Sequence, residues 1–318
     1  MSPPARLPPQ LRGIAAVERD TGISKDTLRI WERRYGFPAP HRDAQGERLY
    51  SDDQVHRLRL LKRLVDAGHR PSRVVGAAAE VIDALIAAPS PSGKAPVVPS
   101  GPEAAAEQAR LMALLTAHDI DGFQRVLAQA LMRMGLRDCV LDLVAPMTVQ
   151  VGEEWARGRF EIFEEHVYTE NVQQVLRQAI HAMPRAAIEQ RPRVLLSTLP
   201  GEKHALGLLM AEVLMRLEGA QCVSLGVQTP VQDLILAAAA HRADIVALSF
   251  GGSLSPSAVL DGLRQLRQGL APVCELWAGG TADALRRRPV TQLDVRRIQS
   301  LREIGGDMAR WSVAHLIA

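Results

Sequence analysis

Residues 21–38 read TGISKDTLRIWERRYGFP and decide the fold at the amino-terminal end of the chain. Ser24 is a typical N-cap residue, and Gly36 suits the left-handed conformation that often ends a helix, so we expect a helix between them. A shorter helix, ending in a glycine turn, is expected over residues 13–23. Two short helices joined by a tight turn are typical of a helix-turn-helix.

One face of the second helix is cationic. Lys25, Arg29, Arg33 and Arg34 recur at helical spacing, while Leu28 and Trp31 are expected to face the first helix. A single such arginine usually lies on a solvated helix face. As a group, these cations suit phosphates and guanine edges, so we expect this face to bind DNA.

The next residues continue the pattern. HRDAQGERLYS, from His41, predicts a glycine-centred hairpin, and residues 52–76 predict two more helices broken at Gly68–His69. TGISKDTLRIWERRYGFP together with GERLYSDDQVHRLRLLKRLVDAGH resembles the winged helix-turn-helix of MerR-type transcription regulators. The resemblance implies binding to a palindromic double-stranded DNA operator, with Arg48 of the wing reaching phosphate or the minor groove. The DNA-binding residues it implies are Lys25, Thr27, Arg29, Arg33, Arg34, Tyr35, Arg42, Arg48 and Tyr50.

A proline-rich stretch follows. Residues 88–102 read APSPSGKAPVVPSGP and contain five prolines, so we expect a linker there, after a DNA-binding domain over residues 11–87. MerR-type domains dimerise through a long helix at this point, whereas the helix near residues 74–88 is brief. We therefore expect the carboxyl-terminal two thirds to assemble the homodimer or homotetramer that a two-fold operator requires.

Composition excludes several classes of protein. The chain is 47% hydrophobic and 23% charged, which excludes wholesale disorder and a fibrous repeat. Three widely spaced cysteines argue against a zinc module or a disulfide framework and favour a reducing cytoplasm. We expect no secretory signal and no membrane span. The formal charge is +3, and residues 11–75 contain 14 Lys and Arg against 9 Asp and Glu, so the basic surplus is amino-terminal.

The remaining residues change pattern at about residue 190. Residues 103–184 show helical periodicity and predict a four-helix bundle. Residues 191–318 alternate short apolar runs with helical stretches, with strands expected at 194–199, 222–225, 245–249 and 273–277. Strands that are apolar on both faces predict an open parallel sheet covered by helices, a flavodoxin-like α/β domain that binds ligands at the carboxyl ends of its strands.

One motif lies at the end of the first of these strands. In Glu202-x-His204-x-x-Gly207 a carboxylate stands two residues from an imidazole, although a lone histidine here is by default a solvent-facing loop residue. The segment resembles the cobalamin-binding domain of methionine synthase and relatives, with Glu in place of Asp. That resemblance implies that His204 is the lower axial ligand of cobalt and that Ser249, Gly279 and Gly280 receive the nucleotide tail. The Gly251-Gly252 loop departs from the family pattern.

A second motif lies in the bundle. Nine residues separate Trp155 from Glu165-His166, and all three would share one helix face unless Gly158 interrupts the helix. By default such a tryptophan is a core anchor. Trp-x9-Glu-His resembles the signature of the light-sensing MerR-type repressors of the CarH/CarA/LitR group, which implies that this bundle covers the upper face of adenosylcobalamin. Ala156 departs from the group, whose light-sensing members carry a cobalt-binding histidine there.

These observations favour a cobalamin-dependent, light-responsive transcription repressor that is not an enzyme. Adenosylcobalamin is the expected cofactor, and its state would control oligomerisation and operator binding. One alternative keeps the fold but binds another tetrapyrrole or a protein partner without photolysis, motivated by Ala156 and the Gly251-Gly252 loop. A third possibility, a corrinoid enzyme or methyl carrier, is disfavoured by the DNA-binding domain.

Overall fold

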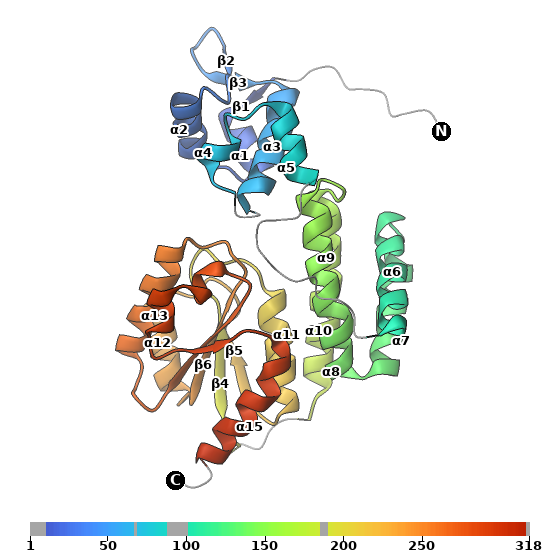
Figure 1. Ribbon diagram of the computed structural model, residues 1–318, viewed down its shortest axis with the longest axis vertical. Coiled ribbons are helices and arrows are strands. Elements are labelled where there is room, and N and C mark those ends of the chain that lie inside the picture. Colours follow the sequence, from blue (N-terminus) through green and yellow to red (C-terminus); the bar gives the residue numbers. More distant parts are fainter. Residues whose placement is uncertain (1–10, 67–68, 88–100, 185–189, 316–318) are drawn as a thin grey trace. The chain divides into compact units, whose positions relative to one another are not determined.

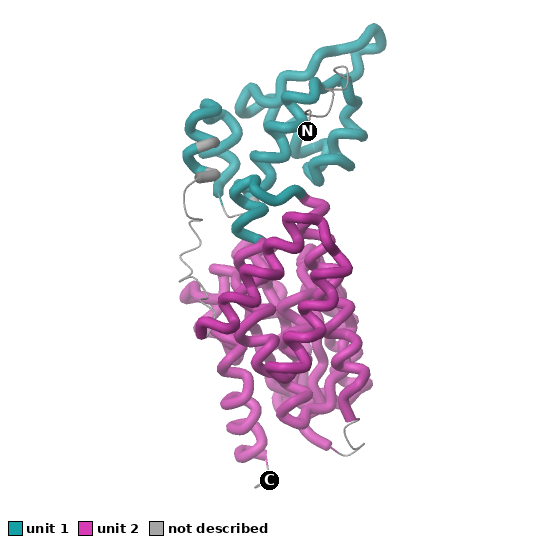
Figure 2. The backbone as a smooth tube through the Cα atoms, turned by 90° about the vertical axis from the view of Figure 1, so that its right-hand side faces the viewer, with its two compact units in different colours: residues 1–93, 152–161 teal, residues 94–151, 162–318 magenta. Residues whose placement is uncertain are grey.

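The computed structural model describes residues 11–66, 69–87, 101–184 and 190–315. It divides into two compact units, the first made of Met1–Gly93 with Gly152–Glu161, the second of Lys94–Val151 with Ile162–Ala318 (Figures 1 and 2). Each unit is described separately. The expected linker at residues 88–102 falls almost wholly outside the described residues.

The first unit is a winged helix. Its elements are β1 (Arg12–Gly13), α1 (Ile14–Thr21), α2 (Lys25–Tyr35), β2 (His41–Arg42), β3 (Arg48–Tyr50), α3 (Asp52–Asp66), α4 (Pro71–Val74) and α5 (Ala79–Ala87). The strands pair antiparallel in the order β1-β3-β2. Buried Leu28, Trp31 and Leu58 belong to one apolar core, so α2 packs inward on the face that carries no cations.

The ends of α1 and α2 follow the expected local rules. Gly22 and Gly36 have φ of 68° and 69°, in the left-handed region, and each closes its helix with a backbone N–H bond. At the start of α2, the Ser24 hydroxyl accepts a hydrogen bond from the backbone N–H of Thr27 at 3.2 Å. The predicted helix-turn-helix is therefore present.

The helical part of the second unit contains α6 (Pro102–Thr116), α7 (Ile120–Met134), α8 (Leu136–Asp138), the π-helical segment η1 (Cys139–Val144), most of α9 (Ala145–Ala156) and α10 (Ile162–Ala182). Because α8, η1 and α9 run on without a break, four helical rods form, as predicted. The buried Tyr168 hydroxyl shares a hydrogen bond with the Thr148 hydroxyl at 2.7 Å, which ties α10 to α9.

The rest of the second unit is an α/β fold. Its strands are β4 (Arg193–Ser197), β5 (Gln221–Ser224), β6 (Ile245–Phe250), β7 (Glu275–Gly280) and β8 (Arg296–Ile298), all parallel in the order β5-β4-β6-β7-β8. The intervening elements are α11 (Leu206–Leu217), α12 (Val231–Ala240), α13 (Pro256–Gly269), η2 (Asp283–Arg286), α14 (Arg288–Thr291), η3 (Leu301–Glu303) and α15 (Ile304–His315).

Helices cover both faces of this sheet. Helices α12 and α13 pack together on one face, and α11 and α15 pack together on the other (Figure 1). Helix α10 of the bundle packs along α11, which joins the two parts of the second unit. The strand order reverses between β4 and β6, so the crevice where such folds bind ligands lies at the carboxyl ends of these two strands.

Candidate nucleic-acid interface and cofactor site

Helix α2 presents its cations outward because Leu28 and Trp31 hold its opposite face in the core. Arg29, Arg33 and Arg34 are exposed, and Lys25, Thr27 and Tyr35 are partly exposed. The Arg34 guanidinium lies 5.5 Å from the centre of the Tyr35 ring, and Arg29 forms an ion pair of 3.2 Å with Asp26. The α2 residues predicted to bind DNA thus share an accessible helix.

Three of the residues predicted to bind DNA lie in the wing. Tyr50 is wholly buried, so its ring supports the wing from within and does not lie on the surface as the predicted DNA contact requires. The Arg48 guanidinium is held by Glu32 of α2, with Nε 2.6 Å from Oε2 and Nη2 3.3 Å from Oε1. Arg42 is exposed, and its Nη1 donates to the Gly46 carbonyl at 2.9 Å.

In the second unit, Glu202 and His204 lie in the connection from β4 to α11, at the carboxyl edge of the sheet. The Glu202 carboxylate is fully buried, whereas the His204 side chain is 65% exposed. Nδ1 of His204 lies 2.5 Å from Oε1 of Glu202, so the carboxylate fixes the orientation of the ring. A carboxylate on one ring nitrogen favours metal coordination through the other, Nε2.

The loop after β6 completes this arrangement. The backbone N–H groups of Gly251, Gly252 and Ser253 all donate to Oε2 of Glu202, at 2.8, 3.2 and 3.3 Å. The Ser253 hydroxyl donates to Oε1 at 3.2 Å. Successive N–H groups of this kind form a concave anion site. The loop that departs from the family sequence is therefore the seat of the Glu202 carboxylate.

The same contacts set the charge of Glu202. Burial alone would raise its pKa, but hydrogen bonds from His204 and from the backbone of His204 and Gly251 outweigh burial and lower the pKa to about 2. The carboxylate is consequently ionised at neutral pH. An ionised partner makes the imidazole a better donor to a transition metal.

Glycines crowd the floor of this edge. A Cβ atom on Gly207 would stand 2.9 Å from Oγ of Ser249, and one on Gly280, whose φ is 118°, would stand 2.3 Å from the Phe250 carbonyl oxygen. A Cβ on Gly279 would lie 3.3 Å from Cβ of Ile298. These four predicted cofactor residues therefore lie around closely packed backbone at the ends of β6 and β7, which suits the approach of a bulky ligand.

The Trp155 motif does not lie on one helix. Helix α9 ends at Ala156, Gly158 turns with φ of 70°, and α10 begins at Ile162, so the helix is interrupted near Gly158 and the face that a continuous helix would have given the motif does not form. Trp155 belongs to the first unit, where its ring centre lies 6.0 Å from the guanidinium of Arg63.

Glu165 and His166 belong to the second unit. Nδ1 of His166 lies 2.6 Å from Oε2 of Glu165, whose other oxygen accepts a hydrogen bond from the Thr169 hydroxyl at 2.8 Å. The His166 side chain is 69% exposed. It is therefore an oriented and accessible imidazole, not a core residue.

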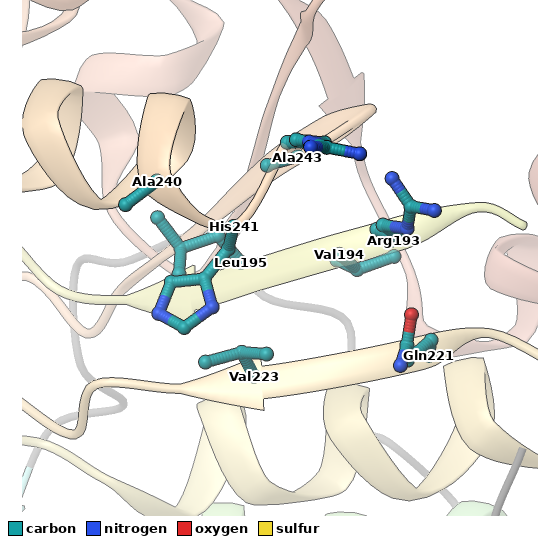
Figure 3. A pocket seen from close by; sticks show the side chains of 9 residues that line it. Arg193, Val194, Leu195, Gln221, Val223, Ala240, His241 and Ala243 are labelled. Atoms are coloured by element: carbon teal, nitrogen blue, oxygen red, sulfur yellow. The ribbon is translucent and has the colours of Figure 1, made fainter. Parts of the chain in front are cut away.

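Two of the cavities that the described residues form lie beside the sheet. One of about 270 Å³ lies at its amino edge, between β4, β5 and the end of α12, where His241 and Arg193 line it (Figure 3). This is the edge opposite to Glu202 and His204. The other, of about 750 Å³, lies between α10, α11 and the end of β5, and Lys203 lines it beside the His204 loop.

The residues that fit a corrinoid are therefore an oriented imidazole, its ionised carboxylate and a glycine-lined edge. Sequence reasoning missed the hydrogen-bond donors of residues 251–253 and the ion pair of Glu32 with Arg48. The glycine pair after β6 was a visible signal for the former. No cluster of three or more metal-ligating side chains occurs in the described part of the chain, and none of the described helices is long and apolar enough to cross a membrane.

A cationic winged helix joined to a helical bundle and a parallel α/β fold with an oriented histidine defines a DNA-binding protein with a ligand-binding unit. Comparisons with known proteins agree. The model of the MerR HTH family of regulatory proteins matches residues 13–80, and that of the B12 binding domain matches residues 107–180.

Two curated relatives match most of the chain. The HTH-type transcriptional repressor CarH of Myxococcus xanthus is 31% identical over 261 residues, covering 82% of this chain and 86% of the relative. The repressor CarA of the same organism is 30% identical over 81% of this chain and 83% of its own. The chain belongs to this family of MerR-type regulators with a B12-binding domain.

Solved structures that match part of the chain include the monomethylamine corrinoid protein of Methanosarcina barkeri, at 15% identity and a TM-score of 0.49, covering 64% of this chain and 96% of that one. A cobalamin-binding protein from Desulfitobacterium hafniense DCB-2 has 19% identity and a TM-score of 0.34, covering 64% of this chain and 98% of its own.

Proposed function

We propose that this protein is a cobalamin-dependent, light-responsive transcription repressor in which the cofactor controls assembly and operator binding. The observation that carries the proposal is the His204 imidazole, fixed by a buried, ionised Glu202 at the ligand-binding edge of a sheet in a chain that also has a cationic winged helix. The kinship with CarH and CarA, both named as repressors, supports the same function.

On the DNA side, α2 enters the major groove and the wing follows the backbone. Arg29, Arg33 and Arg34 are exposed on α2, and exposed Arg42 lies on the wing. Arginines contact phosphates and the O6 and N7 atoms of guanine, so this set provides both affinity and base reading. Two copies of the unit read the two halves of a palindromic operator.

On the cofactor side, His204 would hold the cobalt through Nε2, because Nδ1 is engaged by Glu202. The closely packed edge formed by Ser249, Gly207, Gly279 and Gly280 would receive the nucleotide tail. Trp155, Glu165 and His166 are the further residues that would contact the bound cofactor. Adenosylcobalamin, when bound, supplies a cobalt–carbon bond that visible light breaks.

The switch follows from assembly. In the dark the loaded chain forms a homotetramer that holds DNA-binding units in pairs and represses its promoter, and light disassembles it. Genes for carotenoid synthesis or other light protection are the proposed targets. The protein acts in the cytoplasm as a regulator and catalyses no reaction.

The experiment that tests this function compares wild type, His204→Ala and a matched control, His241→Ala, at the opposite edge of the same sheet. Each full chain is mixed with adenosylcobalamin in the dark. Its visible spectrum and the electron paramagnetic resonance of the reduced cobalt(II) form are then recorded.

Wild type and His241→Ala should show nitrogen hyperfine splitting from a protein imidazole, and His204→Ala should lack it. A histidine-ligated signal that survives in His204→Ala would contradict the proposed ligand. A wild-type protein that leaves the free cofactor's spectrum unchanged would contradict cobalamin dependence.

A further inference from the structure

The recognition helix and the wing are joined by one ion pair, Glu32 with Arg48. Glu32 lies on α2 and Arg48 on β3, and two of the guanidinium nitrogens engage the two carboxylate oxygens. The side chains are 26% and 25% exposed, so both are partly shielded from water. A bidentate arginine–carboxylate pair fixes direction as well as distance. The pair therefore holds β3 at a defined angle to α2.

A second observation concerns charge across the wing. Arg42 of β2 stands directly opposite Arg48 of β3 in the antiparallel register. Like charges directly opposite each other destabilise a strand pair. The Glu32 carboxylate offsets the Arg48 charge, which allows both arginines to occupy this short hairpin.

The charged residues of the wing and of α2 also affect the pKa of a tyrosine in the core beneath the wing. Burial raises the pKa of the Tyr50 hydroxyl, the negative charge of Glu32 raises it further, and the positive charges of Arg48, Arg29 and Arg42 lower it. These charged groups therefore surround one buried tyrosine at the junction of helix and wing. An acidic residue there would repel DNA phosphates if its charge were not matched.

We propose that Glu32 and Arg48 are positioning residues, which set the wing angle so that Arg42 meets the phosphate backbone while α2 lies in the groove. Arg48 acts by holding Glu32 and is not itself the phosphate contact expected from the sequence. This inference rests on the proposed DNA-binding function.

The test uses full-length protein and two DNA probes. One probe is the best palindromic site that the wild-type protein selects from a randomised duplex library, and the other is a duplex of scrambled sequence. Affinities for both are measured at several salt concentrations for Glu32→Gln, Arg48→Gln and the double variant. Arg133→Gln, which removes a cation paired with Glu107 in the bundle, is the matched control. Thermal unfolding of each variant is recorded beside the titrations.

The positioning role predicts a particular pattern. Glu32→Gln releases Arg48 as a lone cation, so binding to scrambled DNA tightens and the salt slope steepens by about 0.9. The double variant has the wild-type net charge, so its slope and its affinity for scrambled DNA return to near wild type. Glu32→Gln and the double variant nevertheless lose specificity, because the wing angle is no longer held. The ratio of the affinity for the selected site to the affinity for scrambled DNA falls roughly tenfold in both. Arg133→Gln changes neither quantity.

Two results would overturn the inference. If Arg48 contacts phosphate directly, Arg48→Gln and the double variant lose the same slope of about 0.9, and Glu32→Gln leaves the slope unchanged. If the pair only stabilises the fold, thermal midpoints fall while the specificity ratio stays at the wild-type value. A wild-type protein that selects no sequence from the library would instead contradict the proposed function, which separates the two failures.

Discussion

Replacing Gly251 by alanine should damage the cofactor site without altering any group that touches the cofactor. A Cβ atom at this position would stand 2.6 Å from Nδ1 and 2.9 Å from Cγ of His204, and 3.1 Å from Oε1 of Glu202. The neighbours are the imidazole and the carboxylate that orients it, not the far end of a flexible chain. The alanine can therefore be accommodated only if the imidazole moves.

The size of the effect follows from these distances. A carbon–nitrogen contact relaxes at about 3.5 Å, so the ring must shift by roughly 0.9 Å, whereas metal–ligand distances tolerate about 0.2 Å. Loss of the group that orients a metal-ligating side chain typically weakens metal affinity about 10- to 100-fold. That range corresponds to about 1.4–2.8 kcal/mol of binding free energy.

The assay is a titration of full-length protein with adenosylcobalamin in the dark, followed by visible absorption, with Gly306→Ala as the control. Nothing lies within 4 Å of a Cβ at Gly306, which is in α15 of the same α/β fold. Gly251→Ala should bind about 10- to 100-fold more weakly and lose histidine ligation, and Gly306→Ala should match wild type. Unchanged affinity and ligation in Gly251→Ala would refute the reasoning that the 251–253 loop orients His204.

Three further predictions concern stability, assembly and the light product. Burial would raise the pKa of Asp244, but hydrogen bonds from the Arg191 side chain and the Arg193 backbone lower it. Asp244→Asn should therefore lower the free energy of unfolding at pH 7 by about 1–3 kcal/mol, and the difference from wild type should shrink as the pH falls below about 3.9. Denaturant titrations measure this difference, and a loss that does not change with pH would contradict the prediction. Light scattering of the full chain in the dark should give a larger mass with adenosylcobalamin than without, because a cofactor that binds the assembled state more tightly favours assembly. A shift of the assembly equilibrium from 1:99 to 99:1 needs a difference in binding free energy of about 5.5 kcal/mol between the two states; identical masses would refute the coupling. Because the methyl group of Ala156 cannot ligate cobalt, the wild-type photoproduct should exchange readily with cyanide and Ala156→His should exchange slowly; a wild-type product that resists exchange would assign the upper position to another residue, such as His166 or His118.

Local signals were enough to predict the winged helix and most of the sheet. Ser24 and Gly36 fix the ends of α2 through a cap and a left-handed turn, which depend on residues close in sequence. The strand at β8, Arg296–Ile298, was missed because two of its three residues are arginines and only its pairing with β7 makes it a strand. The strand expected at 273–277 proved to be Glu275–Gly280, since its glycines pair with β6.

The candidate sites were predictable as residue types but not as contacts. Glu202 and His204 were expected to interact because they are two residues apart, and they do. The donors of Gly251, Gly252 and Ser253 lie in the loop after β6, about 50 residues further along the chain, so the glycine pair was visible in the sequence but its hydrogen bonds to Glu202 were not. In the same way, the sequence did not predict the ion pair of Arg48 with Glu32, because the two residues lie 16 positions apart on different elements.

The central claim joins cofactor, light and DNA, and one measurement tests all three together. Full-length protein loaded with adenosylcobalamin in the dark is bound to its selected palindromic duplex, and fluorescence anisotropy of the labelled DNA is followed before and after illumination. The account predicts tight binding in the dark that requires the cofactor and is lost on illumination. Binding that is equally tight without cofactor, or that survives photolysis unchanged, would contradict it.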